Sequence, residues 1–179
     1  MARAARVGCV LVVWGAFSGA MAAEPRGSSS TAGPAPRVYL SDSSARGVVE
    51  RAILGAQHRL GRPGCRQVFT DFTDQSGRPL LANLDATDLP AADYLVERIW
   101  FVDGSDAPQC VKHLETAAFT ETGSKVVHVC AARFARLAQQ TTAAEILIIH
   151  ELLHTLGLGE NPPSSKEITY RVTPRCGGS

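Results

Sequence analysis

Two histidines and a glutamate in the stretch HELLHTLGLGE have the spacing of a metal centre: His150, Glu151 and His154. On an α-helix, residues four apart lie on one face about one turn from each other, so both imidazoles can point at a single ion. Neutral imidazole binds zinc at about 2.0–2.1 Å. Glu151 can reach a water held by such an ion, take its proton as general base and later pass it to a leaving amine.

The flanking residues predict the buried helix that such a centre needs. Thr142 and Glu145 have the spacing of a capping box, with Thr142 as the N-cap. The positions that follow are nearly all apolar, at the spacings of a helix: Ile146, Leu147, Ile148, Ile149, Leu152, Leu153 and Leu156. Because charged and polar groups are costly to bury unpaired, the two histidines and the glutamate need partners, and a metal ion would supply them.

Residues 142–160 resemble the HExxH region of zinc metallopeptidases of the zincin type. In the metzincin branch the motif continues as HExxHxxGxxH, and the glycine bends the chain so that the last residue becomes the third ligand. Gly157 matches this pattern, and Glu160 stands in place of the last histidine. Because a carboxylate can bind zinc, the resemblance implies Glu160 as third ligand. The methionine turn of metzincins is missing, since the only methionines are Met1 and Met21.

Several alternatives stay open. Gluzincins take their third ligand from a glutamate on a later helix, and Glu167 is available for that role. The chain could be a non-catalytic zincin-like binding module with a structural zinc or none, or it could hydrolyse a non-peptide amide or ester. His128 is interpreted as structural, because the metal's protein positions are already filled. Tyr170 could donate a hydrogen bond to an oxyanion, but a packing role is favoured.

Residues 1–22 resemble a secretory signal peptide. Two arginines precede an apolar stretch over residues 7–20 that is too short to span a bilayer comfortably, and Ala20-Met21-Ala22 fits the cleavage rule. Residues 23–37 are rich in Gly, Ser and Pro and predict a flexible linker. Residues 38–179 would then form one zincin-like metallopeptidase domain. We expect the protein to be secreted or periplasmic.

Four cysteines lie outside the predicted leader: Cys65, Cys110, Cys130 and Cys176. In an oxidising compartment they predict two disulfides, for which three connectivities are possible. We favour Cys65–Cys110 together with Cys130–Cys176. No Cys-x-x-Cys spacing is present, so thiolate ligands for zinc are not indicated.

Helix and strand patterns surround the motif. Ser41-Asp42 starts a helix that ends near Leu60, and a capping box at residues 164–167 starts a last helix that reaches about Val172. Residues 110–119 fit a short helix or a loop. Strand patterns occupy three stretches, namely residues 65–72, 94–102 and 125–130. The zincin resemblance implies an α+β fold, a small mixed sheet with a packing helix behind it. It also implies that strand 97–102 or 125–130 lines the cleft, although both could be ordinary sheet interior.

Composition narrows the function further. The length of 179 residues and a hydrophobic content of 45% fit a single domain with a core. The net charge of +1 gives no support to a nucleic-acid partner, and no stable membrane insertion is expected. The sequence thus predicts a monomeric, exported zinc metalloendopeptidase that acts on a peptide or protein substrate. Zn²⁺ would be held by His150, His154 and Glu160, with Glu151 as general base.

Overall fold

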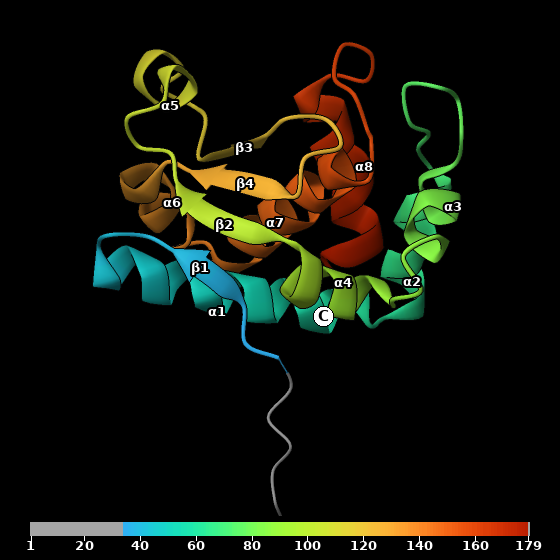
Figure 1. Cartoon of the computed structure of the whole chain (residues 1–179), viewed down its shortest axis with the longest axis horizontal. Coiled ribbons are helices and arrows are strands. Elements are labelled where there is room, and N and C mark those ends of the chain that lie inside the picture. Colours follow the sequence, from blue (N-terminus) through green and yellow to red (C-terminus); the bar gives the residue numbers. More distant parts are fainter. Residues whose placement is uncertain (1–33, 179) are drawn as a thin grey trace, which may run out of the picture. The chain divides into compact units, whose positions relative to one another are not determined.

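A computed structural model describes residues 34–178, so the predicted signal peptide and most of the predicted linker lie outside the described residues. Four short strands form one mixed sheet of order β1-β2-β4-β3 (Figure 1). The strands are β1 (Arg37–Tyr39), β2 (Trp100–Asp103), β3 (Ala118–Thr120) and β4 (Val126–Val129). β1, β2 and β4 are parallel, and β3 pairs antiparallel with β4. The predicted α+β class with a small mixed sheet is confirmed.

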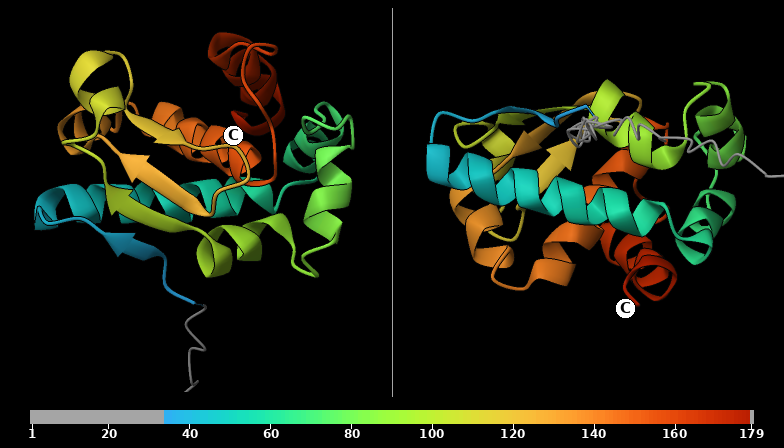
Figure 2. Two further views of the ribbon diagram at one scale, coloured as in Figure 1. Left: turned by 45° about the horizontal axis from the view of Figure 1, so that its top comes forward. Right: turned by 90° about the horizontal axis from the view of Figure 1, so that it is seen from below.

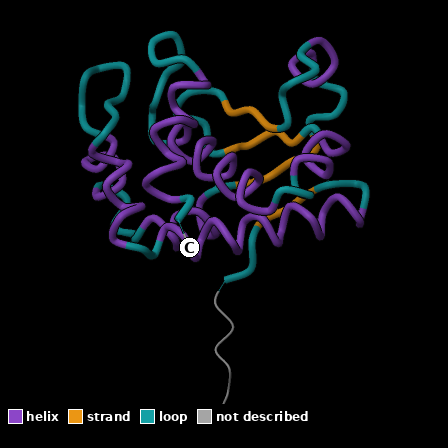
Figure 3. Tube along the Cα trace, turned by 180° about the vertical axis from the view of Figure 1, so that it is seen from behind, coloured by secondary structure: helices purple, strands orange, loops and turns teal. Residues whose placement is uncertain are grey.

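Helices α1 and α7 lie on the same side of the strands (Figure 2). α1 contacts β1, α7 contacts β3, and the two helices contact each other. In the view from behind, helices accordingly lie in front of the strands (Figure 3). The helices are α1 (Ser43–Leu60), α2 (Pro63–Arg66), the 3-10 helix η1 (Gln67–Thr70), α3 (Leu80–Asp85), α4 (Ala91–Arg98), α5 (Pro108–Lys112), α6 (Ala131–Leu137), α7 (Thr141–Thr155) and α8 (Ser165–Cys176). No helix of the described residues is long and apolar enough to cross a membrane.

The first and last helices begin where their caps predict. The Asp42 carboxylate accepts a hydrogen bond from the Ser44 amide at 2.8 Å and caps α1. The Ser164 hydroxyl accepts from the Glu167 amide at 3.3 Å and caps α8. α8 continues past the predicted end at Val172 as far as Cys176.

Two of the three predicted strands are wrong in whole or in part. Residues 65–72 fall in α2, η1 and the turn after them, and residues 94–98 belong to α4, so that only the end of the second stretch forms β2. The reason is visible in the burial of Cys65, Val68 and Phe69, whose spacing of three and four also fits a helix. The third stretch forms β4 as predicted.

β1 and β3 are the strands that the sequence patterns did not indicate: β1 begins at Arg37, the last residue of the predicted linker. β3 lies at the end of the segment that fitted a helix or a loop, of which only α5 is helical. Three residues carry too little periodicity to identify a strand. β3, at the edge of the sheet, contacts α7.

The favoured disulfide pairing is wrong. Cys65 bonds Cys176, and Cys110 bonds Cys130, with Cα–Cα distances of 4.5 and 5.5 Å. The first bond joins α2 to the end of α8, and the second joins α5 to the residue that precedes α6. Two disulfides fit an extracellular location.

Candidate metal centre

The N-terminal half of α7 is held by an ion pair. The predicted capping box does not form, because Gln140 is the N-cap and makes no side-chain cap bond. Glu145 instead lies buried against α1 and pairs with Arg59. The Arg59 guanidinium also donates to the Cys176 carbonyl at 2.8 Å. One arginine therefore ties α1, α7 and the end of α8 together.

The C-terminal end of α7 turns back as the glycines predict. Gly157 has φ +106°, a conformation that favours glycine, and the Leu158 amide donates to the Leu153 carbonyl at 3.2 Å. Asn83 supports this turn from outside. Its Nδ2 donates both to the Leu156 carbonyl and to Asp74 Oδ2, each at 2.9 Å.

The hairpin formed by β3 and β4 is fastened to the same end of α7. The Gly123 amide, in the hairpin turn, donates to the His154 carbonyl at 2.8 Å. Lys125 Nζ, just before β4, donates to the Thr155 carbonyl at 2.5 Å and to the Tyr94 hydroxyl at 2.7 Å. A lysine at this place also complements the negative end of the helix dipole.

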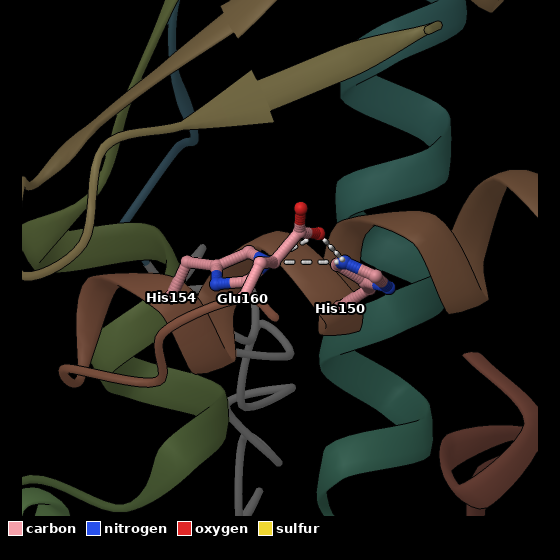
Figure 4. Close-up of side chains that lie close together, drawn as sticks. All are labelled: His150, His154 and Glu160. Atoms are coloured by element: carbon pink, nitrogen blue, oxygen red, sulfur yellow. Dashed lines mark hydrogen bonds and ion pairs between the residues drawn. The ribbon is translucent and has the colours of Figure 1, made fainter. Parts of the chain in front are cut away.

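Three potential ligand atoms meet where α7 ends. His150 Nε2 and His154 Nε2 are 3.0 Å apart, and Glu160 Oε1 lies 3.7 and 3.5 Å from them (Figure 4). A tetrahedral zinc ion with bonds of 2.0–2.1 Å needs ligand atoms about 3.3 Å apart, which is close to this triangle. The group could therefore hold a metal ion. Glu167 is not part of it, because its carboxylate pairs with Arg171 on α8 at 2.5 Å.

The outer ring nitrogens of both histidines have oxygen partners. His154 Nδ1 lies 2.8 Å from the Leu158 carbonyl, and His150 Nδ1 lies 3.0 Å from Thr169 Oγ1. A carbonyl only accepts, so Nδ1 of His154 carries the hydrogen and its Nε2 presents a lone pair. Burial lowers the pKa of His154, which favours this neutral form. The neighbouring His150 lowers the pKa of Glu160, which favours its carboxylate. Both effects suit a cation.

Glu151 lies beside this group, and one of its carboxylate oxygens has no hydrogen-bond partner. The residue is only 3% exposed, and its Oε2 makes no hydrogen bond. Burial raises the pKa of this carboxyl to about 7, although the nearby His150 acts in the opposite direction. A carboxyl with such a pKa can both accept and release a proton near neutral pH.

A cavity of about 880 Å³ adjoins Glu151. Its walls come from residues 115–118, which lead into β3, from α7 as far as Glu151, and from α8. Apolar side chains such as Leu147 and Ile146 line it together with hydroxyls from α8, including Thr169. A mostly apolar cavity with a few polar groups is typical of a binding site for a side chain or a small ligand.

Two other predicted side chains lie elsewhere. His128 stacks on Phe119 across β4 and β3, with ring centres 4.8 Å apart, and is not in the ligand group. Tyr170 is 80% exposed, so the favoured packing role is wrong. Its neighbour Thr169 touches His150 instead, which sequence reasoning missed. The signal available was the four-residue spacing of Ser165, Thr169 and Thr173 along the predicted last helix.

Comparison with known proteins does not assign a family to the chain. No protein-family model matches it, and neither a curated protein nor a solved structure matches it significantly.

Proposed function

We propose that the protein is an exported, zinc-dependent metallopeptidase of the zincin type. The observation that carries the proposal is the convergence of the two Nε2 atoms and Glu160 Oε1 beside the buried Glu151, whose Oε2 makes no hydrogen bond. Two imidazoles and one carboxylate are a donor set that zinc accepts in hydrolases. The HExxH spacing supports zinc over other cations that imidazole binds.

In this proposal His150, His154 and Glu160 hold the ion. When bound, zinc polarises a carbonyl and makes water more acidic. Glu151 Oε2 accepts the proton of the attacking water and then delivers it to the amine nitrogen that leaves. Burial favours the protonated form of this carboxyl, which helps it to hold the proton between the two steps.

The substrate that fits best is an extended peptide. β3 is the last strand in the sheet order, so one of its sides is free of strand pairing among the described residues, and a peptide could add to it. The cavity beside Glu151 would take a side chain close to the scissile bond.

The first experiment separates metal binding from catalysis. Protein purified without chelators is analysed for zinc and then incubated with a panel of quenched fluorescent peptides. We expect one zinc per chain, cleavage by the wild type, and full zinc content with no cleavage for Glu151→Gln. Cleavage by Glu151→Gln at the wild-type rate would refute the role of Glu151. A zinc-loaded wild type that cleaves no peptide would favour a non-catalytic binding module.

The third ligand is tested with two matched glutamates. Glu160→Gln removes a carboxylate from the ligand group, whereas Glu167→Gln removes one that pairs with Arg171. Because an amide is a poor zinc ligand, we expect Glu160→Gln to weaken zinc binding by at least about 10-fold and Glu167→Gln to leave it unchanged. The opposite result would transfer the ligand role to Glu167.

A further inference from the structure

Helix α8 packs along α7 and turns a row of hydroxyls toward the cavity that Glu151 lines. Ile168 and Val172 are buried in the core, and the helix is anchored by the Ser164 cap at one end and the Cys65–Cys176 disulfide at the other. The hydroxyl side chains that line the cavity follow one another at intervals of four residues: Ser165, Thr169 and Thr173. α8 therefore has a fixed place, with one polar face toward the candidate metal centre.

Two threonines of this row, one turn apart, make different contacts. Thr169 Oγ1 lies 3.0 Å from Nδ1 of His150. The Thr173 hydroxyl instead donates to the backbone carbonyl of Thr169 at 2.8 Å. Thr169 is thus the member of the row that touches a histidine of the ligand group, whereas Ser165 lies by Glu160. Thr173 contacts neither histidine and is a natural control for Thr169.

The hydroxyl of Thr169 can donate or accept, and two tautomers of His150 fit the contacts. In the first, Nε2–H donates to His154 Nε2 at 3.0 Å, and the Thr169 hydroxyl donates to Nδ1. In the second, Nδ1–H donates to the Thr169 oxygen, and Nε2 presents its lone pair between His154 and Glu160. Only the second tautomer offers both Nε2 atoms to a cation. The threonine hydroxyl can keep its hydrogen bond in either case.

We infer that Thr169 is a positioning residue for His150: its hydroxyl accepts the Nδ1 hydrogen and holds the ring with Nε2 toward His154 and Glu160. This inference rests on the proposed metal site. Oxygen partners on the outer nitrogen of a ligating histidine commonly change metal affinity by about 10- to 100-fold. The Leu158 carbonyl is the matching partner of His154 but belongs to the backbone, so Thr169 is the partner that a substitution can test.

Thr169→Val deletes the hydroxyl and keeps the shape of the side chain. The Kd for Zn²⁺ is measured by competition with a chromophoric chelator for the wild type, Thr169→Val, Thr169→Ser and Thr173→Val, with thermal unfolding as a check on folding. We expect Thr169→Val to raise the Kd for Zn²⁺ by about 10- to 100-fold. Thr169→Ser, which keeps a hydroxyl, and Thr173→Val should both have the Kd of the wild type. Thr169→Ala repeats the deletion if the valine disturbs the fold.

A second measurement reads the hydrogen bond itself. In the zinc-loaded protein with ¹⁵N-labelled histidine, the Nδ1–H signal of His150 should exchange slowly in the wild type and in Thr169→Ser. It should disappear by fast exchange in Thr169→Val. Unchanged zinc affinity in Thr169→Val, or an equal loss in Thr173→Val, would overturn the inference. A wild-type chain that binds no zinc would overturn the metal site itself and the inference with it, before any variant is compared.

Discussion

At the scale of single residues, Asp74 organises the loop that supports the turn after α7. Its Oδ1 accepts hydrogen bonds from the Ser76 amide, the Ser76 hydroxyl and the Arg78 amide at 2.8, 2.6 and 3.0 Å. Its Oδ2 accepts from Asn83, which also holds the Leu156 carbonyl. These donors, Asn83 and Ser76 foremost, hold the pKa of Asp74 well below its usual range.

This lowered pKa predicts a pH-dependent loss of stability in Asp74→Asn. Because the carboxyl binds a proton less readily in the folded chain than in the unfolded one, its ionised form stabilises the fold. The contribution is complete above about pH 5 and is lost as the pH falls through the folded-state pKa, below an unfolded value of about 3.9. The gap in Tm between wild type and Asp74→Asn should therefore narrow from pH 7 to pH 3, measured by circular dichroism. A constant gap, or the same behaviour in the exposed control Asp106→Asn, would contradict this.

The residues that belong to the motif could be predicted from the sequence because their relation is local. One helical turn links His150 to His154, and a glycine turn brings Glu160 close. The contacts of Thr169 and Asn83 with the centre could not be predicted, because they depend on how separate segments pack. The four-residue spacing around Thr169 indicates a hydroxyl face on α8 but not which residue that face meets. Neither residue type marks a metal site by itself.

At the scale of elements, the packing of α1 against α7 depends on a glycine. A Cβ added at Gly55 would overlap the carboxylate of Glu145, which pairs with Arg59. The absence of a side chain at position 55 thus leaves room for a nearly buried ion pair between the two helices. The pair holds the N-terminal half of the helix that carries the histidines.

Gly55→Ala should therefore destabilise the protein, although alanine is the better helix former. We expect the free energy of unfolding to fall by about 1–3 kcal/mol, the usual cost of overpacking. In a Glu145→Ala background the same change should raise it by up to about 1 kcal/mol, because only helix propensity then acts. Urea unfolding of the four proteins measures both values. Additive effects would show that position 55 and Glu145 are not coupled.

Elements with capping residues were the predictable ones. Asp42 and Ser164 mark the starts of α1 and α8 by local hydrogen bonds that the sequence displays. The prediction of a capping box at Thr142 was wrong because Glu145 pairs with Arg59, which is distant in the sequence. The prediction of a strand over residues 65–72 was wrong because their apolar spacing fits a strand and a helix equally. Packing against α8 favours the helix.

At the scale of the whole described fold, two disulfides close loops of very different length. Cys65–Cys176 spans 111 residues and Cys110–Cys130 spans 20. Their pairing could not be predicted, because it depends on α8 returning to lie beside α2. Spacing along the chain carries no information about that return.

Removing the Cys65–Cys176 disulfide, which closes the longer loop, should lower the stability more than removing Cys110–Cys130. The chain-entropy model assigns about 4.7 kcal/mol to a loop of about 100 residues and about 3 kcal/mol to one of about 15 residues. We therefore expect the Cys65→Ala, Cys176→Ala pair to lower Tm more than the Cys110→Ala, Cys130→Ala pair, measured by calorimetry. The reverse order would indicate that residual structure in the unfolded chain dominates.

The attachment of the hairpin to the end of α7 bears on how a ligand binds in the cavity beside Glu151. Gly123 and Lys125 bind the last carbonyls of the helix, so the hairpin and α7 are fixed to each other next to the histidines. Separating the hairpin from α7 would break the hydrogen bonds of Gly123 and Lys125. On the α8 side the cavity is lined by Lys166, whose exposed side chain can change rotamer without any movement of the backbone, so this side can adapt most readily to the size of a bound ligand.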